Sequence, residues 1–142
     1  MNDLEFKLEV LRDRETFEYE GIIYSDCAFV KLIVDGIDSI KETEDRKGVV
    51  VWDELKKTKD NSGDYLILTC VCGIADDARF DLVTVDRGEK TVKWTFNDDS
   101  YIVWEFDKAD CDLKLSKLNS QIEKLIVKLE PTNVIFPEST RQ

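Results

Sequence analysis

Apolar and polar residues alternate along the first third of the chain with the two-residue period of β-strands. In "LEFKLEV" every second residue is apolar, which places four side chains on one face: Leu4, Phe6, Leu8 and Val10. The segments "TFEYEGIIY" and "CAFVKLIV" continue this pattern and predict further strands. The chain is therefore expected to begin with an antiparallel meander.

The middle of the chain combines connections with apolar runs. The segment "DGIDSIKETEDRK", from Asp35 to Lys47, has a turn signal followed by alternating charges, which predicts a solvent-facing connection. A short helix is expected from about Asp53, and "NSG" at 61–63 predicts a turn. The following "DYLILTCV" is apolar on both alternating faces, as in a central strand that is covered on both sides.

Two hairpins are predicted between residues 80 and 106. The strands "FDLVTV" and "TVKWTF" flank a turn in which Gly88 is expected to supply a positive φ, and "NDDS" joins the second strand to "YIVWEF". Alternation assigns two sets of side chains to one face of each strand: Val92, Trp94 and Phe96, then Ile102, Trp104 and Phe106. The default position of these tryptophans is the core of a sheet.

The period changes after Phe106. Apolar residues now recur in steps of three and four, as in an amphipathic helix, and Pro131 ends the pattern: Cys111, Leu115, Leu118, Ile122, Leu125, Ile126 and Leu129. The sequence therefore predicts an α+β fold, a mainly antiparallel sheet of about six to eight strands with a long C-terminal helix near residues 109–129 packed on one face. We expect one domain over residues 1–142, with the last ten or so residues loosely held.

Charge narrows the range of partners. The chain has 31 Asp and Glu residues against 20 Lys and Arg, a formal net charge of -11, and the excess lies within the first 110 residues. Such a surface repels phosphate backbones and anionic lipids and attracts basic proteins. We therefore expect a basic protein partner and no direct binding to nucleic acid or membrane. The N-terminal segment alternates apolar and charged residues, unlike a signal peptide, which predicts a cytoplasmic location.

The four cysteines are Cys27, Cys70, Cys72 and Cys111, and the sequence contains no histidine. Structural zinc sites need about four ligands, usually supplied by C-x-x-C pairs, whereas Cys70 and Cys72 are separated by one residue. A zinc site would need Cys27 and Cys111 to converge on this pair. The preferred interpretation is that the thiols are free and pack in the core, with no bound metal or cofactor.

Catalytic chemistry has little support in the sequence. Without histidine, neither Cys-His nor Ser-His nucleophile pairs can form, and no phosphate-binding glycine loop is present. The remaining candidates are adjacent carboxylates, namely Asp76-Asp77, Asp98-Asp99 and Asp53-Glu54. Adjacent loop residues rarely face a common substrate, so we expect that the protein is not an enzyme.

The stretches "SGDYLILTCVCG" and "VTVDRGEKTVKWTF" resemble a widespread group of small acidic bacterial proteins, and the similarity covers residues 63–96. Their pattern is G-x-x-x-L-x-x-C-x-C-G, a loop and a strand carrying V-x-W, matched here by Gly63, Leu66 or Ile67, Cys70, Cys72, Gly73, Val92 and Trp94. Members often have a further cysteine and glycine after this motif, and "IADDARF" has neither. In size, acidity and mixed sheet-and-helix pattern, the chain is similar to immunity proteins of polymorphic toxin and contact-dependent growth inhibition systems.

This resemblance and the charge together predict an immunity-type protein that neutralises a basic toxin domain, such as a nuclease, through an acidic surface. The expected contact residues are Asp76, Asp77, Asp81, Asp98 and Asp99, with Trp52, Asp53 and Glu54 as a second patch. Two alternatives stay open. One is a small-molecule or zinc-binding domain that uses the cysteines, and the other is an acidic nucleic-acid mimic that acts on a host enzyme.

Overall fold

The computed structural model describes residues 1–11, 16–19, 22–38, 48–69, 82–97, 102–132 and 134. In chain order the elements are β1 (Leu4–Val10), β2 (Thr16–Tyr19), β3 (Ile22–Ser25), β4 (Cys27–Val34), β5 (Ile37–Asp38), β6 (Val49–Val50), α1 (Trp52–Leu55), the 3₁₀ helix η2 (Lys56–Lys59), β7 (Gly63–Tyr65), β8 (Leu68–Thr69), β9 (Val83–Arg87), β10 (Thr91–Phe96), β11 (Val103–Asp107), α2 (Lys108–Glu123) and β12 (Lys128–Leu129). Antiparallel sheets with one long helix confirm the α+β class.

The first four-stranded sheet is built around β4. Along one edge, β4 pairs antiparallel with the whole of β1, and it also pairs with β12 and β5. The hairpin from β4 to β5 turns through Asp35 and Gly36, whose φ angles are 53° and 81°. Asp-Gly is a preferred pair for a two-residue turn with both φ values positive, so the predicted turn at this place is confirmed.

The second four-stranded sheet has the order β11-β10-β9-β7, and all its pairs are antiparallel. As predicted, Val92, Trp94 and Phe96 are buried on one face of β10. The Trp94 ring is fully buried and contacts Phe106 edge-on, with ring centroids 5.1 Å apart. The expected positive φ at Gly88 is wrong. Gly88 instead lies close to the Thr91 carbonyl, which would be 3.3 Å from an added Cβ.

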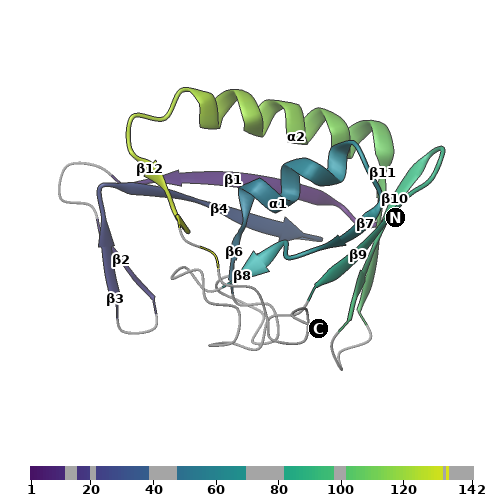
Figure 1. The fold of residues 1–142 in the computed structure, drawn as a ribbon, viewed down its shortest axis with the longest axis horizontal. Coiled ribbons are helices and arrows are strands. Elements are labelled where there is room, and N and C mark those ends of the chain that lie inside the picture. Colours follow the sequence, from purple (N-terminus) through teal and green to yellow (C-terminus); the bar gives the residue numbers. More distant parts are fainter. Residues whose placement is uncertain are drawn as a thin grey trace.

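Helix α2 lies over one face of the first sheet, and the second sheet stands at the end of the molecule where α2 begins (Figure 1). Its first turn is capped by Asp107, whose side chain accepts a hydrogen bond from the Asp110 backbone N–H. The inward side of the helix buries Cys111, Leu115 and Leu118. Within the described residues, neither helix is both long enough and apolar enough to span a membrane.

The structure corrects three expectations about the elements. The described strands form two four-stranded sheets and two short pairs, β2-β3 and β6-β8, rather than one sheet. The segments "TFEYEGIIY" and "DYLILTCV" each contain two described strands, β2 and β3 in the first and β7 and β8 in the second. Helix α2 ends at Glu123, six residues before the predicted end. After it, β12 pairs parallel with β4, and the Glu130 N–H donates to the Ala28 carbonyl over 2.7 Å.

Candidate functional site

Most of the charged side chains on the outward face of the β11-β10-β9-β7 sheet are carboxylates. Because Val92, Trp94 and Phe96 point inward, the alternate residues of β10 point outward, and Lys93 is the central one. The strand register places Asp86 of β9 on one side of Lys93 and Glu105 of β11 on the other, and all three are exposed. Cross-strand neighbours of this kind lie about 5 Å apart.

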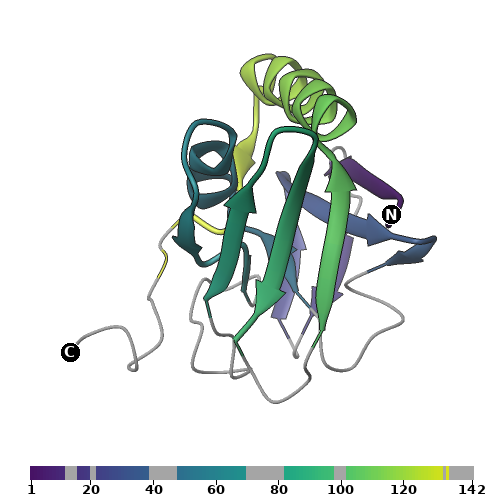
Figure 2. The ribbon, with the colours of Figure 1, turned by 90° about the vertical axis from the view of Figure 1, so that its right-hand side faces the viewer.

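Two further acidic residues extend this row. Asp64 of β7 is paired with Thr84, whose hydroxyl donates to the Asp64 carboxylate over 2.7 Å, and Asp107 ends β11 opposite Thr91. Figure 2 looks onto this face of β9, β10 and β11, and no described helix covers it. We call the exposed residues Asp64, Asp86, Glu105 and Asp107 the acidic sheet face. It presents four carboxylates around the single ammonium group of Lys93.

The five aspartates predicted to form the main contact loops, Asp76, Asp77, Asp81, Asp98 and Asp99, lie outside the described residues. Their neighbours in the chain are described at one end of the sheet, where β9 begins and β10 ends. Leu82 precedes β9 and Asn97 follows β10, and the Asn97 side-chain amide donates to the Leu82 carbonyl and to the Thr84 hydroxyl, over 3.1 and 2.8 Å. The chain positions next to Asp81 and Asp98 are therefore held together at one end of the acidic sheet face.

The predicted second patch is not one surface. Trp52, Asp53 and Glu54 are consecutive residues of α1, and a helix turns each side chain by about 100° from the previous one. Asp53 is exposed and pairs with Lys56 over 3.1 Å. Glu54 is buried: one carboxylate oxygen accepts a hydrogen bond from the Leu66 N–H over 2.9 Å, and the other lies 3.1 Å from the Lys57 ammonium group. Glu54 therefore does not offer a surface carboxylate to a partner.

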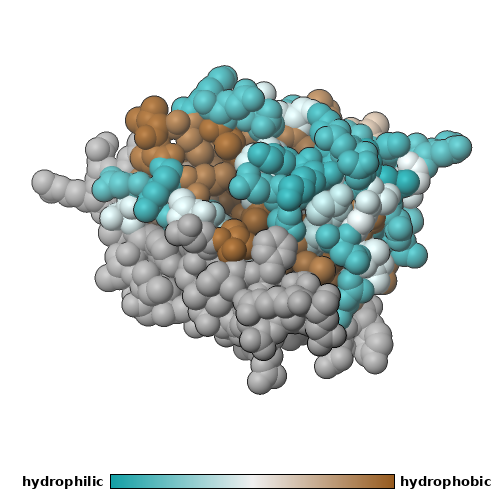
Figure 3. Space-filling model, in the orientation of Figure 1, coloured by the Kyte–Doolittle hydropathy of each residue, from teal (hydrophilic) through white to brown (hydrophobic). Residues whose placement is uncertain are grey.

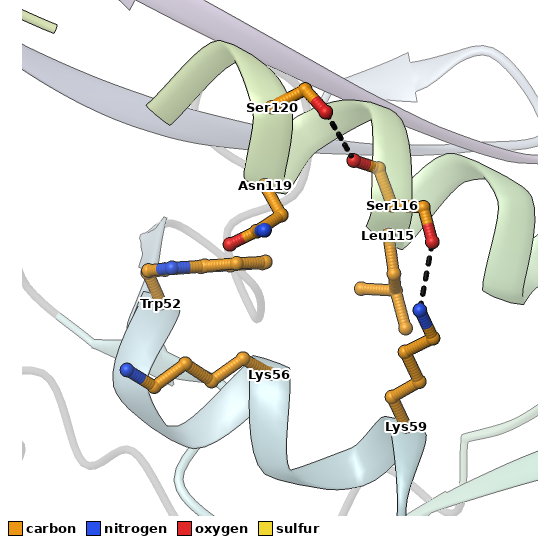
Figure 4. Close-up of a pocket in the computed structure, with 7 residues that line it drawn as sticks. All are labelled: Trp52, Lys56, Lys59, Leu115, Ser116, Asn119 and Ser120. Atoms are coloured by element: carbon orange, nitrogen blue, oxygen red, sulfur yellow. Dashed lines mark hydrogen bonds between the residues drawn. The ribbon is translucent and has the colours of Figure 1, made fainter. Parts of the chain in front are cut away.

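Trp52 is half-buried, packs against the core and lines a cavity of about 290 Å³ between α1–η2 and α2. The other lining residues come from both helices: Lys56, Lys59, Leu115, Ser116, Asn119 and Ser120 (Figure 4). The Lys59 ammonium group reaches across and donates to the Ser116 hydroxyl over 2.8 Å. The surroundings of Trp52 in this cavity are thus basic and polar, not acidic as the sequence suggested.

The Arg87 guanidinium group joins the two helical walls of this cavity. From the inner side of β9 it donates two hydrogen bonds to the Asp112 carboxylate of α2, over 2.9 and 3.0 Å. It also donates to the Thr58 carbonyl of η2 over 3.0 Å. A planar guanidinium that binds both partners at once fixes the separation of η2 and α2 more firmly than a single ammonium group would. Arg87 is therefore a positioning residue for the cavity.

The two described thiols lie far apart. Cys111 lies near the start of α2, whereas Cys27 pairs with Lys128, beyond the other end of this helix (Figure 1). From Cys111 to Glu123 the helix is about 18 Å long, whereas two thiolates on one zinc ion lie within about 5 Å. A zinc site that contains both cysteines is therefore ruled out. Cys70 and Cys72 lie outside the described residues, and within the described part no three His, Cys, Asp or Glu residues are placed to hold a metal ion.

Burial dominates the chemistry of both thiols. It raises the pKa of Cys111 to about 12, and the neighbouring Asp112 carboxylate acts in the same direction. Burial also raises the pKa of Cys27, with a further contribution from the Glu130 carboxylate. A buried thiol with a raised pKa is a poor nucleophile and a poor metal ligand at neutral pH.

Sequence reasoning missed two groups of residues. The acidic sheet face had a signal, because the alternation that assigns Trp94 to the core also assigns Lys93, Asp86 and Glu105 to the opposite face. No sequence signal indicated the cavity, because Lys59 and Ser116 are brought together only by the packing of α1–η2 on α2.

No family model, curated protein or solved structure matches this chain.

Proposed function

We propose that this protein is an immunity-type inhibitor that binds a basic protein domain, such as the nuclease domain of a toxin, and neutralises it. The observation that carries this proposal is the acidic sheet face, which no described helix or strand covers and which has four carboxylates around Lys93. A nuclease attracts a polyanion into a positively charged cleft, and an array of carboxylates can occupy the same cleft.

The position of these carboxylates on strands also favours this function. Asp86 and Glu105 are held on paired strands whose opposite faces are buried, so that their backbones do not need to become ordered on binding. Their mutual repulsion, only partly offset by Lys93, is relieved when Lys and Arg side chains of a partner arrive. The net charge of -11 adds a long-range attraction that speeds the encounter.

The test uses the product of the gene next to the one that encodes this chain as the candidate partner. We would measure its association rate with the wild type, with the double variant Asp86→Asn/Glu105→Gln, and with a control that removes two exposed carboxylates elsewhere, Glu5→Gln/Asp60→Asn. Both variants lose the same charge. The proposal predicts that the sheet variant associates at least about fivefold more slowly at low salt than the control, and that high salt removes the difference.

Three results would contradict the proposal. The first is that the neighbouring gene product does not bind, the second is that the two variants associate at equal rates, and the third is that the rates are independent of salt.

A further inference from the structure

We propose that the cavity between α1–η2 and α2 is a binding site for a small anionic molecule with a flat apolar body, an aromatic carboxylate. The proposal is independent of the acidic sheet face. It rests on the way the cavity combines an exposed aromatic surface, a buried apolar residue and ammonium groups within one small volume.

The apolar part of the ligand would lie on Trp52 and Leu115. Figure 4 shows the Trp52 indole ring edge-on between Asn119 and Lys56, with the end of the ring and the Leu115 side chain projecting into the cavity from opposite helices. Leu115 is only 2% exposed, so it forms part of the cavity floor, while Trp52 stays half-buried. In the space-filling view, apolar side chains lie beside and beneath the hydrophilic side chains of the two helices (Figure 3). A flat ring can stack on the indole and contact Leu115.

The charged part of the ligand would be bound by Lys59. In a chain with 31 acidic residues and 20 basic ones, this ammonium group forms no ion pair with any described residue and donates to the neutral Ser116 hydroxyl instead. A ligand carboxylate would replace that hydroxyl by a charged acceptor and form a shorter, stronger hydrogen bond. Lys56, at the rim, pairs with Asp53, but both side chains are more than half exposed, so this pair can exchange partners at little cost.

Asn119 would orient the ligand. Its side-chain amide nitrogen donates to Glu123 over 3.2 Å, which leaves its oxygen to accept a hydrogen bond. Figure 4 places the Asn119 amide over one face of the Trp52 ring, near the end that points into the cavity, so a ligand would stack on the other face and direct a ring N–H or O–H past this end toward the Asn119 oxygen.

The volume limits the size of the ligand. A cavity of about 290 Å³ has room for about ten water molecules and falls at the lower end of the range for ligand pockets. It therefore suits a molecule of roughly ten to fifteen non-hydrogen atoms. A nucleotide or a folded peptide segment would need more space.

The test follows the three indole N–H signals of the ¹⁵N-labelled protein by NMR, with the Trp52 signal assigned by its absence from Trp52→Phe. The probes are a panel of aromatic carboxylates, including indole-3-acetate and quinoline-2-carboxylate, each matched with its neutral amide. We expect carboxylates to shift the Trp52 signal in a saturable way and the corresponding amides to bind at least about tenfold more weakly.

Two lysine variants then test the assignment of the charge. Lys59→Met keeps most of the side chain but removes its charge, and should weaken binding of the best carboxylate about tenfold or more. Lys117→Met removes the same charge from the exposed surface of α2, outside the cavity, and should leave the affinity unchanged. Equal urea midpoints for both variants would exclude a folding defect.

The proposal is overturned if no carboxylate of the panel shifts the Trp52 signal, or if amides bind as tightly as carboxylates. It is also overturned if Lys117→Met weakens binding as much as Lys59→Met, because the attraction would then come from the overall charge and not from the cavity.

Discussion

Glu54 and Asp53 are neighbours in the chain, yet their carboxylates have opposite surroundings. Asp53 is exposed and pairs with the exposed Lys56, whereas Glu54 accepts a hydrogen bond from the buried Leu66 N–H. We predict that Glu54→Ala lowers the free energy of unfolding by about 2 to 3 kcal/mol, because it leaves that N–H without a partner. Asp53→Ala should change it by less than about 0.5 kcal/mol. Urea unfolding of both variants is the measurement, and equal losses would show that the Leu66 hydrogen bond is unimportant.

The surroundings of Cys111 make a prediction about pH. Burial raises the pKa of its thiol from an ordinary value of 9.0 to about 12. Between these values the unfolded chain loses the proton while the folded chain keeps it, so the contribution of this thiol to stability is present below pH 9 and is lost as the pH rises toward 12. We expect the stability of Cys111→Ala to fall less steeply than that of the wild type in this range.

The same burial predicts the reactivity of Cys111. At pH 8 iodoacetamide should label it only when urea unfolds the chain, as peptide mass spectrometry would detect. Rapid labelling of the folded protein would contradict the buried position of this thiol in α2.

At the level of single residues, the sequence predicts the core better than the surface. The burial of Trp94 and Phe106 follows directly from alternation, because the apolar residues on one face of a strand pack together in the core. The grouping of Trp52, Asp53 and Glu54 failed because adjacent residues of a helix cannot share a face. That signal was present, since a short helix from about Asp53 was itself predicted from the sequence.

Helix α2 offers a direct test of the packing between elements. Leu118 is 2% exposed on its inward side, and Leu113 is 54% exposed on the same helix. We predict that Leu118→Ala lowers the free energy of unfolding by about 2 to 5 kcal/mol through lost burial and a residual cavity. Leu113→Ala, with the same change in helix propensity, should have an effect below about 0.5 kcal/mol. Similar urea midpoints for the two variants would mean that α2 does not pack as described.

The C-terminal end of α2 could not be predicted from the spacing of apolar residues. Leu125, Ile126 and Leu129 fit the spacing of an amphipathic helix, which led to a predicted end near residue 129. The chain leaves the helix at Glu123 because an edge of β4 can accept a further strand, and Glu130 satisfies the Ala28 carbonyl there. A free edge formed some 100 residues earlier in the chain leaves no trace in the local spacing.

At the scale of the whole molecule, the excess of negative charge should oppose folding. A chain with a net charge of -11 repels itself more strongly when compact than when unfolded. Raising the salt concentration from about 0.02 M to 0.3 M shortens the Debye length to below 10 Å and screens this repulsion. We predict that the urea midpoint rises with sodium chloride over this range, and a fall would indicate that favourable ion pairs outweigh the repulsion.

The arrangement of the sheets was the least predictable property of the whole molecule. Alternation identifies the buried face of each strand but not its neighbour, so one sheet and two sheets give the same pattern. The two hairpins formed by β9, β10 and β11 were predictable because these strands are consecutive and few residues separate them in the sequence. The separate sheet around β4 depends on β12, which is distant in sequence, and no local signal reports that pairing.

The contacts between the first residues of the chain and residues 105–114 also limit the order in which the protein can fold as it is synthesised. The Asn2 side chain accepts a hydrogen bond from the Glu105 N–H, 103 positions later, and the Lys114 ammonium group donates to the Leu4 carbonyl. While the ribosome is still translating α2, strands β1 and β4 can pair, but the apolar side that the helix will cover stays exposed. Completion of the first sheet must wait until β12 has left the exit tunnel, and the apolar side beneath α2 stays uncovered until that helix has emerged.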